Sequence, residues 1–175
     1  MVVNSSSSKN KYKDLSNAEK ARLAGAIWIH GSIDIEYSRK RGYYYPRIML
    51  SMPNPLPFDY AKDPKEKVWV GNDGCFTLEI GRQKLVEKRL NEILPYIGGI
   101  EKEQIEIALQ IIKINSLRKK TEKEKQKLRE LYGQWKECSE RLEKWVKDFK
   151  ARYQNVKRRR VPAKIWNKAY LLEDC

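Results

Sequence analysis

The apolar residues of this chain change their spacing abruptly at Gly31, and this change constrains the possible fold more than any other feature of the sequence. Over residues 16–30 they recur every three or four positions, which predicts an amphipathic helix. Ser16, followed three residues later by Glu19, is typical of a capping box at the start of a helix. Over residues 32–38 apolar and polar residues alternate, which predicts a half-buried strand. The side chains expected to point inward are Leu23, Ala24, Ile27 and Trp28 of the helix and Ile33, Ile35 and Tyr37 of the strand.

The remaining pattern predicts two hairpins and a series of helices. Residues 39–42 form a turn and residues 43–52 return as a second strand. Prolines predict a loop over 53–66, with one short helical turn. A second hairpin joins strands at 67–70 and 75–80, and helices are expected around 85–94, 105–112 and 121–153. Because the helices are grouped after antiparallel strands, the predicted fold class is α+β.

The charge of the chain points to a polyanionic partner. Thirty-seven Lys and Arg residues against 23 Asp and Glu residues give a formal net charge of +14, which favours nucleic acid over a membrane surface. No apolar stretch has the roughly 18 residues that a membrane span requires, and the polar N-terminal segment does not resemble a secretory signal. Three cysteines predict free thiols in a reducing compartment, and the single histidine excludes a histidine-cluster metal site.

Three regions are expected along the chain. Residues 1–14 are polar and Ser-rich and predict a flexible tail. Residues 15–155 form the folded domain, and residues 156–175 form a basic extension. The apolar stripe of the long helix indicates packing on the body of the domain, rather than a coiled-coil seam, because it is rich in aromatic residues.

The segment Leu23–Gly31 carries the most specific motif. Its sequence LAGAIWIHG, followed by Ser32 and Ile33, resembles the LAGLIDADG motif of homing endonucleases, with five of the nine positions identical. The segment 93–109, a Leu-Pro-aromatic turn leading into a helix with Lys and Gln, is similar to a late segment of that family. Together with the expected order of elements, the resemblance covers roughly residues 15–115.

The resemblance implies that each chain forms an αββ-αββ-α saddle with extra C-terminal helices. It also implies that two identical chains pair along their motif helices. Such a homodimer would bind a long, pseudo-palindromic site in double-stranded DNA and hydrolyse phosphodiesters with Mg²⁺ or Mn²⁺ near the ends of those helices. Oxygen ligands suit these ions. The dimer contacts that the resemblance implies are Arg22, Gly25, Ala26 and Ile29.

One departure from the motif bears on catalysis. His30 occupies the position of the family's metal-binding carboxylate, and a neutral imidazole is a poor ligand for Mg²⁺. The backbone carbonyl of Ile29 remains as a metal ligand, and the resemblance places Glu101 and Lys102 in the catalytic centre. Three readings of His30 stay open: an inactivated enzyme, a site that recruits another acid such as Glu101, and a protein that works without cleavage.

Strand alternation predicts which side chains face DNA. Arg side chains suit guanine and phosphate, and Asp or Glu can accept from cytosine N4. A basic stretch near the C-terminus is expected to add phosphate contacts. The predicted DNA-binding residues are Ser32, Asp34, Glu36, Ser38, Arg39, Lys40, Arg41, Tyr45, Arg47, Met49, Ser51, Trp69, Asp73, Thr77, Glu79, Lys157, Arg158, Arg159 and Arg160.

The sequence therefore predicts a site-specific DNA endonuclease of the homing type, intron-encoded and intracellular, in the cytoplasm or nucleoid of a prokaryote or in an organelle. Two alternatives remain open. An RNA-binding maturase that helps an intron to fold does not require the motif acid, and neither does a DNA-binding protein that does not cleave.

Overall fold

The computed structural model describes residues 12–40, 42–54, 56–63, 66, 68–71, 74–117 and 119–153. The chain divides into two compact units, Met1–Leu142 and Glu143–Cys175. The first unit contains all the described strands and helices except the last turns of the final helix, which belong to the second unit.

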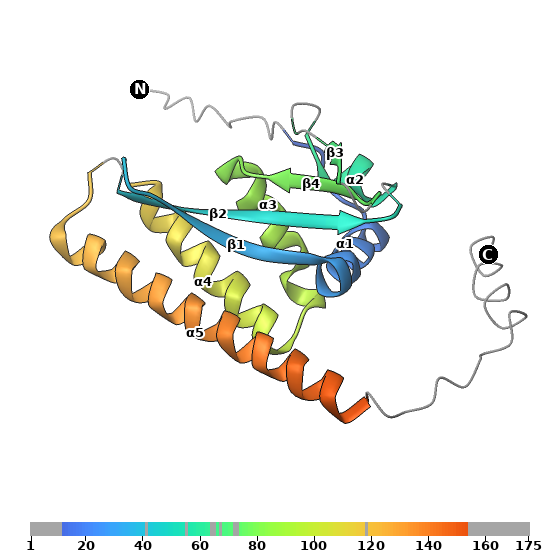
Figure 1. Cartoon of the computed structure of the whole chain (residues 1–175). Coiled ribbons are helices and arrows are strands. Elements are labelled where there is room, and N and C mark those ends of the chain that lie inside the picture. The colour runs from blue at the N-terminus through green and yellow to red at the C-terminus, as the bar shows by residue number, and fades with distance from the viewer. Residues whose placement is uncertain are drawn as a thin grey trace, which may run out of the picture. The chain divides into compact units, whose positions relative to one another are not determined.

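Two helix–hairpin segments followed by helices make up the described chain (Figure 1). This order confirms the predicted αββ-αββ-α arrangement and the α+β class. The elements are α1 (Asn17–His30), β1 (Gly31–Ser38), β2 (Tyr43–Met52), α2 (Leu56–Ala61), β3 (Val68–Val70), β4 (Phe76–Ile80), α3 (Gln83–Ile93), the 3₁₀ turn η1 (Leu94–Tyr96), α4 (Gly99–Asn115) and α5 (Glu122–Tyr153).

The four strands form one antiparallel sheet in the order β1-β2-β4-β3. The β1–β2 register places Asp34 opposite Arg47, and the β2–β4 register places Ser51 opposite Thr77. α1, α3 and α4 pack against β2 and cover one face of the sheet (Figure 1). On the other face the side chains remain partly or fully exposed, so one face of the sheet is open.

The main core lies between the sheet and the helices on its covered face. Ile48 and Leu50 of β2 and Leu78 of β4 are completely buried, and they cluster with Leu23 of α1 and Leu90 of α3. Full burial of a side chain of this size contributes about 2 kcal/mol. The core therefore fixes α1 and the sheet in one rigid arrangement.

A second cluster attaches the first half of α5 to the rest of the first unit. Ile35 of β1, Ile111 of α4 and Leu128 and Leu131 of α5 are buried together. For this half of α5 the predicted packing on the body of the domain is confirmed. Among the described residues, no helix combines the length and the apolar character that crossing a membrane would require.

Beside this cluster, a row of aromatic rings in contact extends toward the end of β1. The Tyr44 ring centroid lies 4.8 Å from that of Tyr37 and 4.8 Å from that of Tyr132, and the Trp135 indole N–H donates to the Ile33 carbonyl oxygen at 3.2 Å. The prediction that Tyr37 points fully inward is wrong, because 44% of this residue is exposed. Its ring lies at the end of this row of rings, next to Tyr44, and is partly exposed to solvent.

Gly31 is required by the close approach of α1 to the sheet. A Cβ atom at this position would lie 2.8 Å from the Met49 carbonyl oxygen and 2.9 Å from the Ile27 Cα atom. Both neighbours are backbone atoms, which cannot move aside without shifting α1 or β2. The abrupt change of spacing in the sequence therefore coincides with a tight helix–strand junction.

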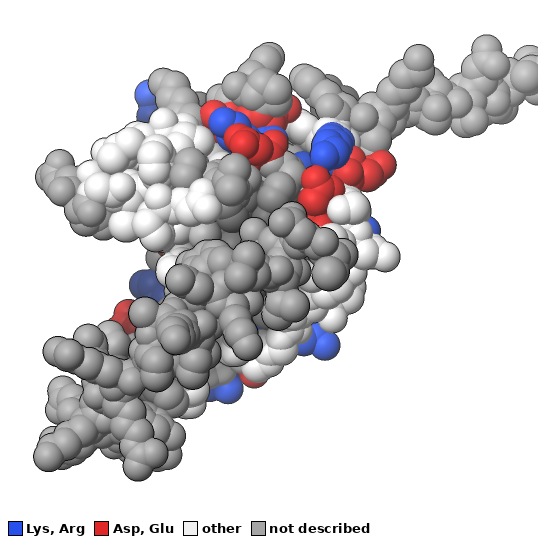
Figure 2. Space-filling view, turned by 90° about the vertical axis from the view of Figure 1, so that its right-hand side faces the viewer, with Lys and Arg blue, Asp and Glu red and all other residues white. Residues whose placement is uncertain are grey.

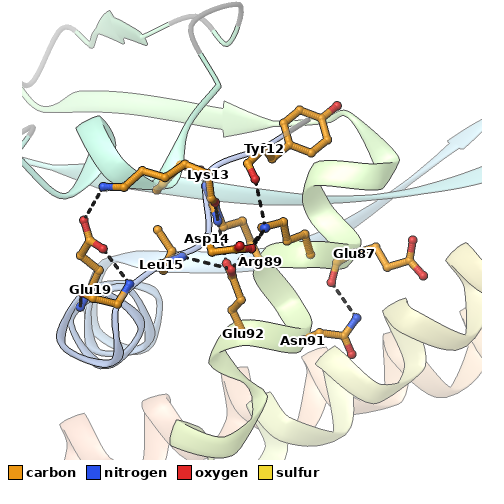
Figure 3. A network of polar contacts seen from close by, with 12 residues as sticks. Tyr12, Lys13, Asp14, Leu15, Glu19, Glu87, Arg89, Asn91 and Glu92 are labelled. Atoms are coloured by element: carbon orange, nitrogen blue, oxygen red, sulfur yellow. Dashed lines mark hydrogen bonds and ion pairs between the residues drawn. The ribbon is translucent and has the colours of Figure 1, made fainter. Parts of the chain in front are cut away.

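Residues 12–14, predicted to belong to a flexible tail, are held against α3 (Figure 3). The Arg89 guanidinium, which is 1% exposed, donates to the Lys13 carbonyl oxygen at 3.1 Å and to the Glu92 carboxylate at 2.6 Å. The Lys88 ammonium donates to the Tyr12 carbonyl oxygen at 3.1 Å. The prediction is therefore wrong for residues 12–14, because side chains 76 positions later bond their backbone; residues 1–11 lie outside the described chain.

The capping box predicted at the start of α1 is confirmed. The Glu19 N–H donates to the Ser16 hydroxyl oxygen at 3.2 Å, and the Ser16 N–H donates to the Glu19 carboxylate at 2.8 Å. The hydrogen bond from the Ser16 backbone, and then the bond from Lys13, lower the pKa of Glu19 from 4.5 to about 2.

This pKa shift predicts how the Glu19→Gln variant responds to acid. Because the folded state lowers the pKa of Glu19, the carboxylate stabilises the fold above pH 4.5, and this contribution disappears as the pH falls toward about 2. The difference in free energy of unfolding between the two proteins should therefore shrink over that range. Urea unfolding followed by circular dichroism measures it, and a difference that does not depend on pH would contradict the prediction.

Candidate nucleic-acid interface

The open face of the sheet brings together most of the residues predicted to bind DNA. They occupy alternate positions of the strands, and their neighbours along β1, β2 and β4 point mainly toward the core. The strand registers place them side by side across the sheet. The residues on this open face are Ser32, Asp34, Glu36, Ser38, Tyr45, Arg47, Met49, Ser51, Trp69, Thr77 and Glu79.

Arg47 lies at the centre of this face and bonds three carboxylates. Its Nε and Nη2 atoms donate to Asp34 Oδ2 at 3.0 and 2.7 Å. Its Nη1 atom donates to Glu36 Oε2 at 3.1 Å and to Glu79 Oε1 at 3.1 Å. We call Asp34, Glu36, Arg47 and Glu79 the Arg47 cluster. Three strands contribute to it, so the cluster also ties β1, β2 and β4 together.

The cluster keeps Arg47 charged but leaves the centre of the face acidic. Burial lowers the pKa of the guanidinium, but the hydrogen bonds and charges of Asp34 and Glu79 outweigh this effect and raise the pKa above its ordinary value. Three carboxylates around one guanidinium give this centre a formal charge of −2. Arg47 is therefore not the free cation that the sequence suggested.

Uncharged side chains surround the Arg47 cluster. Tyr45 and Met49 are partly buried beside it on β2. The hydroxyl oxygens of Ser51 and Thr77 lie 3.2 Å apart. Trp69 of β3 is 44% exposed. Hydroxyl groups and apolar side chains of this kind can contact base edges and thymine methyl groups in a major groove.

Cations are found at the margin of the open face. Arg39 and Lys40 are exposed in the turn between β1 and β2. The other cations predicted to bind DNA, Arg41 and Lys157–Arg160, lie outside the described residues, as does Asp73. On the side of the molecule in Figure 2, the described acidic and basic side chains are intermixed beside an uncharged area. The charge excess does not form one basic patch on the described part of that side.

The motif helix α1 carries a second exposed surface. Ile29 is 68% exposed, and Arg22 is exposed about two turns before it. A Cβ atom added at Gly25 would have no neighbour within 4 Å, so nothing in the described chain requires a glycine there. Arg22, Gly25, Trp28 and Ile29 form what we call the α1 stripe.

Two predictions for α1 need correction. Trp28, predicted on the apolar inner side, is 68% exposed, because Leu23, Ala24 and Ile27 already fill the side that faces the sheet. Ala26, predicted at the dimer contact, is 8% exposed and belongs to the core of the protomer. Trp28 and Ile29, which have the highest exposed fractions among the exposed large apolar side chains of the described chain, are therefore neighbours on one helix.

The described residues do not form a site suited to Mg²⁺. His30 is exposed at the end of α1, and Glu101 lies in the first turn of α4. Lys102 pairs with Glu106 of the same helix at 4.0 Å. Among the described residues, no group of three or more His, Cys, Asp or Glu side chains is arranged to hold a metal ion. The described donors of a single protomer therefore do not fit the expected Mg²⁺ or Mn²⁺.

No protein-family model matches the chain, and neither does any curated protein. The chain is similar to solved structures of the homing endonuclease I-CvuI, one in complex with the I-CreI target in the presence of Mg, where the DNA is not cleaved, and one in complex with its own target in the presence of Ca. Sequence identity is 20% and 22%, and the TM-score is 0.45 in both cases. The similar part covers 55% and 56% of this chain and about two thirds of I-CvuI, 66% and 68%.

Proposed function

We propose that the protein binds double-stranded DNA at specific sites, as a homodimer whose two α1 helices meet along the α1 stripe. The observation that carries this proposal is the exposed apolar surface of α1, which leads directly into a sheet face open to solvent. Two copies joined in this way would present two open faces to one duplex, which suits a long, pseudo-palindromic site.

The α1 stripe has the features of a helix–helix contact. Trp28 and Ile29 are each 68% exposed, which is unfavourable in water unless a partner covers them. Gly25 faces open space, and a glycine on a helix surface lets a second backbone approach closely. A second copy of the same helix provides both the apolar cover and the matching small residue.

The open face has the features of a groove-binding surface. Its side chains combine hydrogen-bond acceptors, hydroxyl groups and apolar groups, with Arg39 and Lys40 at the margin. Base edges in the major groove offer partners for all of these groups. The cations beyond the described residues, Lys157–Arg160 among them, supply the positive charge that attraction to phosphates requires.

The predicted activity also includes cleavage, and the candidate metal-binding side chains described above do not support this part of it. Since His30 replaces the motif acid and the described residues of one protomer complete no set of donors, we propose binding without hydrolysis for the chain as it stands. The His30→Asp variant adds a carboxylate at this position. It should raise the affinity for Mn²⁺, measured by electron paramagnetic resonance, and create or increase nicking of bound DNA. An unchanged Mn²⁺ affinity would contradict the placement of the site.

A mobility-shift experiment with the full chain tests DNA binding itself. Duplexes selected from a random pool should be retained far more strongly than unselected duplexes, and retention should not change when EDTA replaces Mg²⁺. Affinity should fall steeply with salt as phosphate counterions are released. Preference for a structured intron RNA over every selected duplex would favour the maturase alternative and overturn the proposal.

A further inference from the structure

Arg47 has almost no hydrogen-bonding capacity left for DNA. A guanidinium has five N–H groups, and Arg47 makes four hydrogen bonds to Asp34, Glu36 and Glu79. One N–H group, on Nη2, is left over. Bidentate recognition of guanine by arginine needs two N–H groups that point the same way. Arg47 could read guanine only by giving up charge-assisted bonds that it already makes.

The groups of the Arg47 cluster that remain open to a ligand are acceptors. Both carboxylate oxygens of Asp34 are already engaged, because Oδ1 accepts from the Ile35 N–H at 2.9 Å and Oδ2 accepts two hydrogen bonds from Arg47. The side chains of Glu36 and Glu79 are 57% and 36% exposed, and each bonds Arg47 through only one carboxylate oxygen. In the described part of the chain, no hydrogen bond involves Glu36 Oε1 or Glu79 Oε2.

The position of these oxygens is fixed from both sides. Glu36 comes from β1 and Glu79 from β4, and Arg47 of β2 lies between them and holds both carboxylates. The two oxygens therefore have defined positions on rigid strands, where they can accept from a donor on a base edge. In the major groove the donors are the exocyclic amino groups, N4 of cytosine and N6 of adenine.

We infer, building on the proposed DNA binding, that the centre of the open face selects cytosine or adenine, the bases with an exocyclic amino group, at a fixed position of the contacted strand, with Glu36 and Glu79 as the specificity-determining acceptors and Arg47 as their positioning residue. The carboxylates act in a second way. Guanine and thymine present acceptors in the groove, so a wrong base leaves a negative oxygen against an acceptor and close to the phosphates. The cluster thus combines attraction to the correct base with rejection of the wrong ones.

Selection of bound duplexes from a random pool tests this inference, with the full chain and four variants. Glu36→Gln and Glu79→Gln remove a negative charge but keep the shape. Arg47→Lys keeps the positive charge, but an ammonium group has three donors and no planar fork, so it cannot reproduce the four hydrogen bonds of Arg47. Glu137→Gln, on the exposed side of α5, is the matched control for the loss of one charge. Thermal unfolding of each variant confirms that the sheet is intact.

The wild-type protein is expected to select cytosine or adenine at a fixed position in each half of the site. Glu36→Gln or Glu79→Gln should lower that preference about 10-fold and raise the affinity for random duplexes. Arg47→Lys should weaken the preference at the same position, while Glu137→Gln changes nothing. Selection of guanine that is lost only in Arg47→Lys would overturn the inference and leave DNA binding standing. If the wild-type chain retains no duplex, both the inference and the proposed function are overturned.

Discussion

The Arg89→Ala variant is expected to lose about 3–5 kcal/mol of unfolding free energy, since it removes one partner of a buried ion pair. Arg89 is 1% exposed and donates to the Ala61 carbonyl oxygen at 2.9 Å, to the Lys13 carbonyl oxygen and to Glu92. Alanine would leave the Glu92 carboxylate, whose side chain is 12% exposed, without its closest cation. The carbonyl oxygens of Ala61 and Lys13 would lose a donor as well.

Chemical denaturation followed by circular dichroism measures this loss. Arg141→Ala is the matched control, because Arg141 also donates to a carboxylate, that of Glu103, at 2.8 Å, but its side chain is 56% exposed. An exposed pair of this kind contributes at most about 1 kcal/mol. If the two variants lost the same small amount, Arg89 would not be the anchor that joins the N-terminal segment, α2 and α3.

The Ile29→Glu variant is expected to be a monomer that has lost most of its affinity for DNA. The 68% exposed side chain of Ile29 lies at the proposed contact between two α1 helices. In a dimer, two glutamates would be buried against apolar side chains without partners, at a cost of at least about 3 kcal/mol. Every 1.4 kcal/mol corresponds to a factor of ten in affinity, so dimerisation should weaken by about 100-fold or more.

Analytical ultracentrifugation and a mobility shift on a selected duplex measure the two effects. Leu117→Glu is the matched control, because Leu117 is also apolar and is 41% exposed, but lies after α4 and away from α1. The control should remain dimeric and keep its affinity. A dimeric Ile29→Glu protein with unchanged DNA binding would show that the α1 stripe is not the contact.

Much of the fold followed from local patterns in the sequence. The change of spacing at Gly31 located the end of α1 and the start of β1, since a side chain at Gly31 would collide with the backbone of Met49 and Ile27. The turn predicted at 39–42 also sets the β1–β2 register, which places Asp34 opposite Arg47. The pairing of Asp34 with Arg47 at the centre of the open face was therefore predictable from the sequence, although the residue type alone indicates guanine or phosphate as the partner of Arg47.

The structural features that could not be predicted from the sequence depend on contacts between distant segments. Helical spacing places Trp28 beside Ile27 but does not show that other side chains already fill the inner side of α1. The anchoring of residues 12–14 depends on Lys88 and Arg89, which are 76 residues away and carry no local signal. The third acid of the Arg47 cluster, Glu79, reaches Arg47 only because β4 pairs with β2.

Disulfide cross-linking through position 25 tests most directly whether two α1 helices meet on a DNA duplex. The Gly25→Cys substitution is made in a chain whose three cysteines are replaced by alanine, with Gln110→Cys on the exposed side of α4 as the control. A disulfide requires Cα atoms about 4.4–6.8 Å apart. Oxidation should convert the Gly25→Cys chain, and not the control, into a covalent dimer that binds the selected duplex as tightly as the reduced protein. A Gly25→Cys chain that cross-links no better than the control, or a covalent dimer that has lost the duplex, would contradict the account.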